Sequence, residues 1–144
     1  QNSPYIIQGY RYFNVYGQGE DHKNDQASPV HKFTKQALET GVIKVFQGSE
    51  NFRRDFVNAE DIAILKIEML NRNISGVFNC GTGRAISFMD VANLVAKKYN
   101  AKIEVIPFPD HLKGHYQEYT QANTNKLQTV GCPIAFRSVE EYLR

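Results

Sequence analysis

The sequence contains little cysteine, no long apolar run and almost no excess of one charge. Its two cysteines, Cys80 and Cys132, could form one bridge, but so low a content is typical of a reduced cytosolic protein. No apolar stretch approaches the roughly 18 residues of a membrane span. Lysine and arginine total 17 against 15 acidic residues, a net charge of +2, which leaves no electrostatic footprint for nucleic acid. We therefore expect a cytoplasmic protein without membrane or nucleic-acid partners.

The amino terminus lacks an initiator methionine and also lacks the basic and apolar segments of a signal peptide. The length of 144 residues suits one domain, and 42% hydrophobic with 22% charged residues is close to the globular average. We interpret the chain as an ordered part of a longer protein.

Several catalytic motifs are also missing. A dinucleotide-binding domain carries a glycine-rich turn between its first strand and helix. The triplets GQG at residues 17–19 and GTG at residues 81–83 follow predicted strands but lack the third glycine, so we interpret both as plain turns. The sequence has no G-x-S-x-G nucleophile motif and no Tyr-x-x-x-Lys pair. His111 and His115 have the i, i+4 spacing of a metal pair, but no third ligand follows, and we expect no metal.

Periodicity and capping residues predict strands that alternate with amphipathic helices. We expect extended segments at residues 5–16, 43–46, 54–57, 76–80 and 103–106. We expect helices at residues 28–40, 58–70 and 87–99, near 121–130 and near 138–144, with the polar residues 17–26 as a loop. Asn58 and Ser87 are predicted helix caps, and Leu65 and Leu70 fall on one face of the second helix. This order predicts an α/β protein with parallel strand pairing.

Two stretches carry a resemblance to a known family. Residues 10–17 (YRYFNVYG) and 54–57 (RDFV) resemble the extended short-chain dehydrogenase/reductase family, whose members epimerise or dehydrate nucleotide-linked sugars. Residues 22–23 (HK), 45–54 (VFQGSENFRR) and 107–117 (PFPDHLKGHYQ) narrow the resemblance to the ADP-heptose epimerases of this family. The resemblance covers essentially the whole chain, but only the carboxyl-terminal half of such an enzyme.

The resemblance implies an α/β fold that is the carboxyl-terminal part of an extended short-chain dehydrogenase/reductase. It would comprise the last strands of a Rossmann-like parallel sheet and the small substrate-binding lobe. Residues 1–17 and 58–100 are expected in the sheet and helices of the cofactor domain, and residues 18–57 and 101–144 mainly in the lobe. The glycine-rich turn and the catalytic Tyr-x-x-x-Lys pair would lie in the other half, so we expect the 144-residue piece alone to be inactive.

By resemblance, the longer protein to which the chain would belong, the parent enzyme, inverts C6 of the heptose in ADP-D-glycero-D-manno-heptose by transient oxidation with bound NADP. The product would serve the synthesis of the lipopolysaccharide core. The residue that would distinguish NADP from NAD lies outside the chain, so NAD stays open. Inversion needs an acid/base group on each side of the carbon. One is the tyrosine of the absent pair, and the other, by resemblance, is Lys23. The family also implies a homo-oligomer, namely a pentamer.

The resemblance assigns further contacts. Asn14 and Val15 match the strand end that meets substrate and nicotinamide, so Val15 and Lys23 are implied cofactor contacts. Arg54 matches an arginine that faces the diphosphate, since a planar guanidinium can hold two oxygens. The other implied substrate contacts are Phe46, Gln47, Gly48, Ser49, Tyr116 and Lys32.

The chain departs from the family pattern at two places, and alternatives stay open. Asn24-Asp25 replaces a Gly-Ser pair after the lysine, and Lys32 takes the register of a substrate-facing histidine, with His31 one position earlier. Without the resemblance, Lys23 is typical of a solvated loop. The parent protein could be another nucleotide-sugar epimerase or dehydratase, and the chain could be a non-catalytic module for sugar-nucleotide binding or assembly.

Overall fold

The computed structural model describes residues 4–110, 113–114, 116–132 and 134–144, so the predicted histidine pair lies outside the described residues. The strands are β1 Gln8–Tyr12, β2 Asn14–Tyr16, β3 Val42–Phe46, β4 Arg53–Asn58, β5 Gly76–Cys80, β6 Ala85–Ser87 and β7 Lys102–Ile106. The helices are the 3-10 helix η1 Asp21–Gln26 and α1 Pro29–Thr40, α2 Ala59–Leu70, α3 Phe88–Tyr99, α4 Asn125–Thr129 and α5 Val139–Tyr142.

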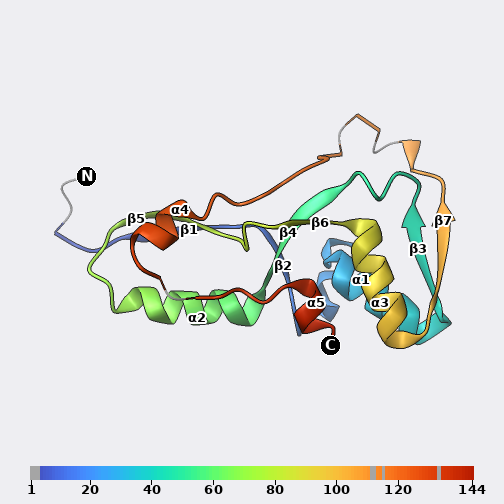
Figure 1. Cartoon of the computed structure of the whole chain (residues 1–144), viewed down its shortest axis with the longest axis horizontal. Coiled ribbons are helices and arrows are strands. Elements are labelled where there is room, and N and C mark those ends of the chain that lie inside the picture. Colours follow the sequence, from blue (N-terminus) through green and yellow to red (C-terminus); the bar gives the residue numbers. More distant parts are fainter. Residues whose placement is uncertain (1–3, 111–112, 115, 133) are drawn as a thin grey trace.

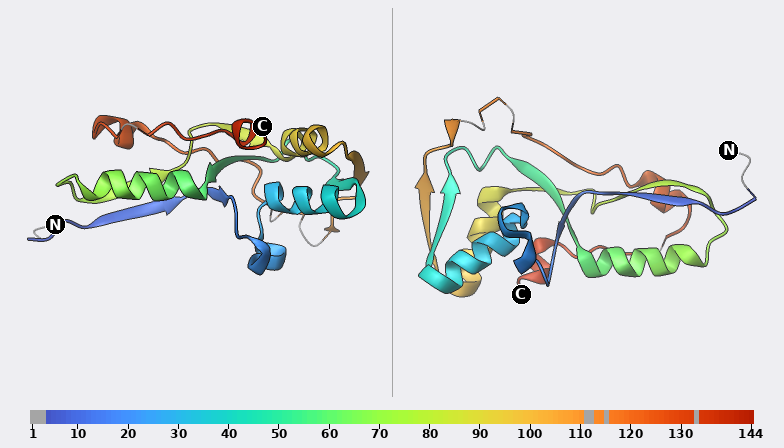
Figure 2. Two further views of the ribbon diagram at one scale, coloured as in Figure 1. Left: turned by 90° about the horizontal axis from the view of Figure 1, so that it is seen from below. Right: turned by 180° about the vertical axis from the view of Figure 1, so that it is seen from behind.

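The elements form two groups at the ends of an elongated molecule, and β4 joins them (Figures 1 and 2). One group holds β1, β5, α2 and α4, and the other holds α1, α3, β3 and β7. Strands β1 and β5, β2 and β4, and β3 and β7 pair in parallel, whereas β6 runs antiparallel to β4. Because β4 pairs with β2 along its second half and with β6 along its first half, it crosses the middle of the molecule. The predicted α/β class with parallel pairing is confirmed.

Two predictions about the first 26 residues need correction. The single strand expected at 5–16 is divided at Phe13, whose amide donates to the Cys80 carbonyl while the flanking residues pair with two different strands. Its start is also not buried, since Ile6 and Ile7 are 52% and 60% exposed. The polar segment expected as a loop contains η1, which forms because buried Glu20 collects donors from both of its ends.

The capping predictions are confirmed. The Ser28 hydroxyl accepts from the His31 amide at the start of α1, and the Asn58 side chain accepts from the Glu60 amide at the start of α2. Ser87 begins α3 with a capping box that Asp90 completes. Helix α4, however, spans only Asn125–Thr129 of the predicted 121–130.

Two apolar clusters stabilise the two ends. The larger one joins α1 and α3 to β3 through Phe33, Val45, Val91 and Val95, among others. The smaller one lies between β5, α2 and α4 and contains Leu65, Met69, Phe78, Cys80 and Leu127. Leu70 does not belong to it: this side chain is 78% exposed at the end of α2, contrary to the predicted apolar face. No helix of the described residues is long and apolar enough to cross a membrane.

Candidate functional site

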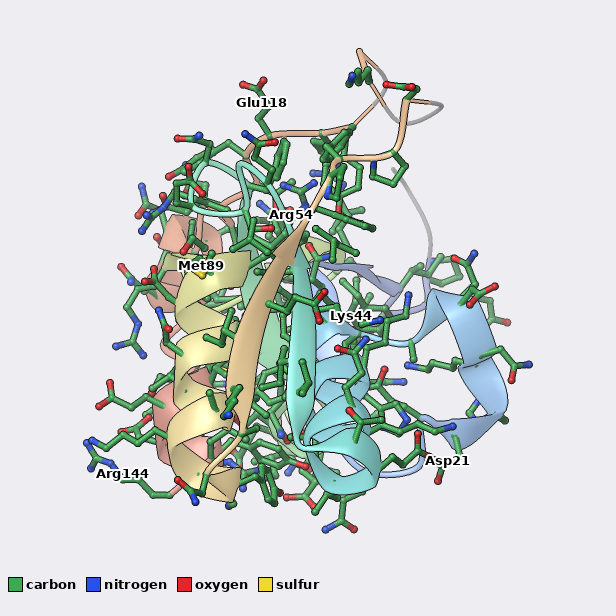
Figure 3. The ribbon with its side chains drawn as sticks, turned by 90° about the vertical axis from the view of Figure 1, so that its right-hand side faces the viewer. Asp21, Lys44, Arg54, Met89, Glu118 and Arg144 are labelled. Carbon is green, nitrogen blue, oxygen red and sulfur yellow. The ribbon has the colours of Figure 1, made fainter. Side chains whose placement is uncertain are left out.

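Arg54, the second residue of β4, is the centre of the candidate site. It is only 6% exposed and lies in the interior, whereas Glu118 and Arg144 project from the edge (Figure 3). Its guanidinium donates to the carbonyls of Arg53, at 2.9 Å, and Gln117. The same group lies 5.5 Å from the ring centroids of both Phe88 and Tyr116, within cation–π range.

The Arg54 charge has no acidic partner in the part of the chain that the structure describes. No ion pair joins it to a carboxylate, and the adjacent Asp55 directs its side chain to other groups. Burial lowers the pKa of the Arg54 guanidinium, although arginine stays protonated in proteins. A buried cation held only by carbonyls and rings keeps an uncompensated charge, which favours an anionic ligand.

An aromatic cluster lies beside Arg54. Phe108 packs against Phe46, Phe52 and Tyr116, with ring centroids 5.7, 5.3 and 5.6 Å apart. Phe52 and Tyr116 are themselves 4.8 Å apart in an edge-on arrangement. These contacts bring Phe46 and Tyr116, two predicted site residues far apart in the sequence, to the same side of Arg54.

The predicted site residues 46–49 form a tight turn after β3. Gly48 has φ +86°, a left-handed conformation that glycine adopts at no steric cost. The Ser49 hydroxyl donates to the Phe46 carbonyl at 2.5 Å, so this hydroxyl serves the turn. The Gln47 amide donates to the Ile106 carbonyl, which fixes the turn against β7.

Asn14 and Val15 lie on β2, beside Phe56 and Val57 of β4. The Thr120 hydroxyl donates to the Asn14 side-chain oxygen at 3.4 Å, and the Thr120 amide donates to the Arg53 carbonyl. Thr120 thus links Asn14 to the strand that carries Arg54. Sequence reasoning missed this residue, because a threonine in a predicted loop carries no signal of its own.

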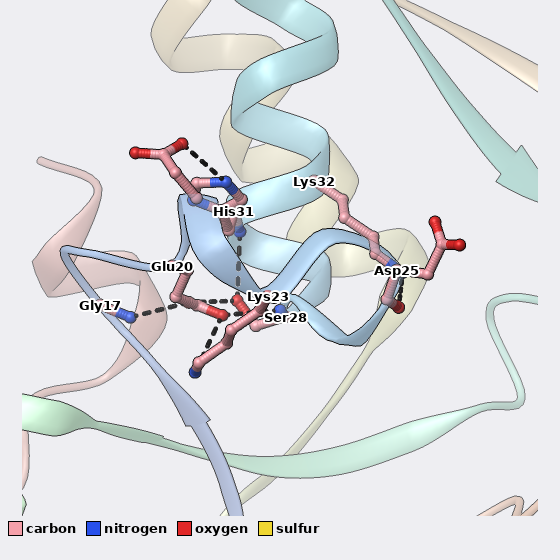
Figure 4. A network of polar contacts seen from close by, with 8 residues as sticks. Gly17, Glu20, Lys23, Asp25, Ser28, His31 and Lys32 are labelled. Atoms are coloured by element: carbon pink, nitrogen blue, oxygen red, sulfur yellow. Dashed lines mark hydrogen bonds and ion pairs between the residues drawn. The ribbon is translucent and has the colours of Figure 1, made fainter.

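Lys23 lies in η1, on the turn between β2 and α1. Its ammonium is 3.4 Å from a carboxylate oxygen of Glu20, and its side chain is 34% exposed. Lys23 thus lies on a 3-10 turn, partly exposed and beside one carboxylate, and its role as an acid/base group stays a prediction. Figure 4 shows that the Lys23 amine projects away from Lys32 and Asp25, where the Lys32 amine donates to the Asp25 carbonyl at 2.6 Å. His31 makes a separate contact with Asp21 at 3.4 Å.

Asp55 is a further residue that the sequence did not single out. It is fully buried and accepts from the amides of Thr82, Gly83 and Ala122 and from the Thr82 hydroxyl, at 2.7 to 3.0 Å. A Cβ atom on Gly81 would lie 2.6 Å from the Ala122 side chain, so this turn requires glycine. Because Asp55 occupies the amides of the GTG turn, the structure supports the interpretation of that turn as a plain one.

The Gly17 amide donates to Glu20 at 3.1 Å, so this amide and those of Thr82 and Gly83 already have acceptors within the chain. Within residues 4–110, 113–114, 116–132 and 134–144, no group of three histidine, cysteine or acidic side chains could hold a metal ion. Both cysteines are free, and burial raises the pKa of the Cys80 thiol to about 11.

Comparisons with known proteins identify the family and the fold of the chain. The model of the NAD dependent epimerase/dehydratase family matches residues 4–81. The chain is 46% identical over 145 residues to an ADP-L-glycero-D-manno-heptose-6-epimerase of Alkalilimnicola ehrlichii, covering 96% of this chain and 45% of that enzyme.

Two solved structures show the same arrangement. The Helicobacter pylori ADP-L-glycero-D-manno-heptose-6-epimerase superimposes with a TM-score of 0.81 at 27% identity, over 96% of this chain and 42% of that one. The Thermus thermophilus UDP-glucose 4-epimerase in complex with NAD has a TM-score of 0.73 at 25% identity, over 93% and 43%.

The fold is thus that of part of an extended short-chain dehydrogenase/reductase. The chain belongs to the NAD dependent epimerase/dehydratase family. It spans less than half the length of the relatives that it matches.

Proposed function

We propose that the chain is the carboxyl-terminal, substrate-binding part of an epimerase that inverts C6 of an ADP-linked heptose. We call the complete protein the parent enzyme. The observation that carries the proposal is buried Arg54, which has no carboxylate partner among the described residues and lies beside the cluster of Phe46, Phe108 and Tyr116. A guanidinium suits the two phosphates of a nucleoside diphosphate, and aromatic rings suit its base. The 46% identity to an enzyme of that name supports ADP-heptose as the substrate.

Each polar residue of the site has a defined task in this reaction. Arg54 would bind the diphosphate, and the Asn14 amide group, whose oxygen accepts from Thr120, would donate to a sugar hydroxyl. Lys23 would donate a proton to the C6 oxygen as hydride returns to C6, whereas the second acid/base group, in the rest of the parent enzyme, would take the proton of that oxygen as hydride leaves. A bound nicotinamide cofactor would supply the hydride acceptor and donor for C6.

The described residues fit only one end of that cofactor. By resemblance, Val15 of β2 and the partly exposed Lys23 of η1, on the turn that follows this strand, would contact its nicotinamide. The amides of Gly17, Thr82 and Gly83 are bonded to Glu20 and Asp55, and by resemblance the phosphate cradle would lie in the rest of the parent enzyme. By resemblance we propose NADP as this cofactor, a cytoplasmic homo-oligomer as the working form, and lipopolysaccharide core synthesis as its purpose.

Calorimetric titration of the chain with ADP and with adenosine tests the diphosphate site. We expect ADP to bind more tightly than adenosine, and Arg54→Met to weaken ADP about 10- to 100-fold while leaving adenosine nearly unchanged. Arg53→Met is the matched control, because the neighbouring Arg53 is exposed and donates to the Ala85 carbonyl. Equal losses in both variants would contradict the assignment of Arg54.

Assays of the parent enzyme test the substrate. Nuclear magnetic resonance spectra of ADP-D-glycero-D-manno-heptose should show conversion to the L-glycero epimer, with no turnover of UDP-glucose or dTDP-glucose. Turnover of a hexose derivative alone would assign a different epimerase or dehydratase. Binding of ADP-heptose without turnover in the parent enzyme would favour the non-catalytic module.

A further inference from the structure

Glu20 connects three elements around the turn that carries Lys23. It is only 2% exposed, yet it is an acidic residue in a segment between β2 and α1. One carboxylate oxygen accepts from the Gly17 amide, just after β2, at 3.1 Å and from the Ser28 hydroxyl at 2.8 Å. The other oxygen accepts from the Ser28 amide at 2.8 Å and from the Lys23 ammonium at 3.4 Å (Figure 4).

Glu20 holds Lys23 at two points. Its backbone carbonyl accepts from the Lys23 amide at 2.9 Å, and its carboxylate contacts the ammonium of the same residue. Burial alone would raise the pKa of Glu20, but the hydrogen bonds from Ser28 and Gly17, together with Lys23, lower it below its usual value. The carboxylate is therefore charged at neutral pH, and it pairs with an ammonium that is still one-third accessible to solvent.

The contrast with Lys32 argues that this pairing is specific. Lys32 lies nine positions further along the chain, and its amine donates to a backbone carbonyl in an exposed bond. A carbonyl binds an ammonium without neutralising its charge, whereas a buried carboxylate both restrains and neutralises it. The three neutral donors from Gly17 and Ser28 already join the end of β2 to the start of α1 through Glu20, and the contact with Lys23 is made in addition to them.

We infer that Glu20 is a positioning residue for Lys23: its buried carboxylate fixes the Lys23 ammonium on the turn that follows β2, the strand that carries Asn14 and Val15. The inference rests on the proposed function of Lys23. It adds a residue for which neither the motifs nor the family resemblance assigned a role.

The test compares Glu20→Gln, which removes the charge but keeps the side-chain length, with Ser28→Ala, which removes one donor to Glu20 and the α1 cap without touching Lys23. In the parent enzyme we expect Glu20→Gln to lower kcat about tenfold, since misplacing a reacting group by an ångström has effects of this order or larger. Ser28→Ala should lower Tm but leave kcat within about twofold.

In a Lys23→Met background, Glu20→Gln should cause no further loss of kcat. An undiminished loss in that background would overturn the inference, because Glu20 would then act independently of Lys23.

Competitive acetylation of the chain, followed by mass spectrometry, tests the ion pair without any assay of turnover. The Lys23 amine should acetylate several-fold faster in Glu20→Gln than in wild type, relative to exposed Lys44, and should not change in Ser28→Ala. Unchanged Lys23 labelling in Glu20→Gln would overturn the inference.

If Glu20→Gln does not fold, Glu20→Asp replaces it. The shorter side chain withdraws the carboxylate by one methylene, so this variant should still raise Lys23 labelling and lower kcat. Absence of ADP-heptose turnover in the wild-type parent enzyme would count against the proposed function, while the labelling would still decide whether Glu20 restrains Lys23.

Discussion

Arg54 and Arg137 place the same side chain in opposite surroundings. The Arg137 side chain is 39% exposed, yet its guanidinium bonds Asp61 at 2.9 Å, Glu60 at 2.8 Å and the Asn58 side chain at 3.0 Å. Arg54 is 6% exposed and bonds only backbone carbonyls. The hydrogen bond with Glu60, and the contacts with Asp61, raise the pKa of Arg137, whereas burial lowers that of Arg54.

This difference separates an arginine whose charge is balanced within the chain from one that we propose binds a ligand. Arg137 joins the carboxyl-terminal segment to the first turn of α2, and its charge is balanced by two carboxylates. Arg54 carries the cost of burial without that balance, which is reasonable where a substrate anion completes the site. Lys23 is intermediate, because its carboxylate partner leaves it partly accessible.

Lys23→Met in the parent enzyme should give the largest effect. If Lys23 moves a proton, its loss removes an interaction made in the transition state. We expect kcat to fall by about 10²- to 10⁴-fold, with KM nearly unchanged. Steady-state kinetics with ADP-heptose measure both constants, and Lys35→Met is the matched control, because the exposed Lys35 pairs with Glu39 at 3.9 Å. A raised KM at unchanged kcat would make Lys23 a phosphate contact.

Arg54→Met should affect binding in the ground state and the transition state alike. The charge-assisted bonds to the diphosphate contribute about 1.5–3 kcal/mol, so KM for ADP-heptose should rise about 10- to 100-fold at nearly constant kcat. The Met side chain can still pack between Phe88 and Tyr116, so we expect Tm to change little. A large loss of stability with an unchanged KM would place Arg54 in the same class as Arg137.

Arg137→Met should show the reverse pattern. The substitution removes the guanidinium bond to Asp61, a carboxylate that is 4% exposed. Of the two bonds that residue 137 donates to Asp61, it leaves the one from the backbone amide, at 2.7 Å. Urea denaturation should report a loss of about 1.5–3 kcal/mol in the free energy of unfolding, while KM stays within about twofold. Glu60→Gln changes the exposed partner of Arg137 and should lower the free energy of unfolding by less than about 1 kcal/mol. A KM increase in Arg137→Met that equals the one in Arg54→Met would remove the distinction between the two arginines.

The parts of the fold that depend on local chemistry could be predicted from the sequence. Ser28, Asn58 and Ser87 begin helices because their side chains accept the first free amides, and spacing alone shows this. Tertiary contacts explain the failures. Strand 5–16 divides because its two halves pair with partners more than 40 residues away, and nothing in those residues indicates such a division.

The site divides in the same way. Motifs point to Arg54 and Lys23, whose roles stay predictions, but the lack of an acidic partner for Arg54 among the described residues is a property of the folded chain. Glu20, Asp55 and Thr120 were missed because their hydrogen-bond partners are residues up to 106 positions away or backbone groups that any residue possesses. Only the spatial arrangement shows that Asp55 serves the fold alone, whereas Glu20 also contacts Lys23.

Asn24→Gly should give the smallest effect, and it should raise the stability of the chain rather than lower it. Asn24, which follows Lys23, has φ +46° and ψ −121°, a combination that a side chain disfavours and glycine adopts readily. It also stands where the family pattern has glycine. Removing the side chain should relieve strain of about 1 kcal/mol, reduced by the greater freedom that glycine has in the unfolded chain. We therefore expect Tm to rise by a few degrees at most, with Lys23 labelling and kcat unchanged.

Asn100→Gly is a matched control, because Asn100 has φ +53° at the end of α3, far from Lys23 in the sequence. A loss of kcat in Asn24→Gly alone would show that the strained turn itself helps to hold Lys23, and would extend the positioning role from Glu20 to the backbone that follows it.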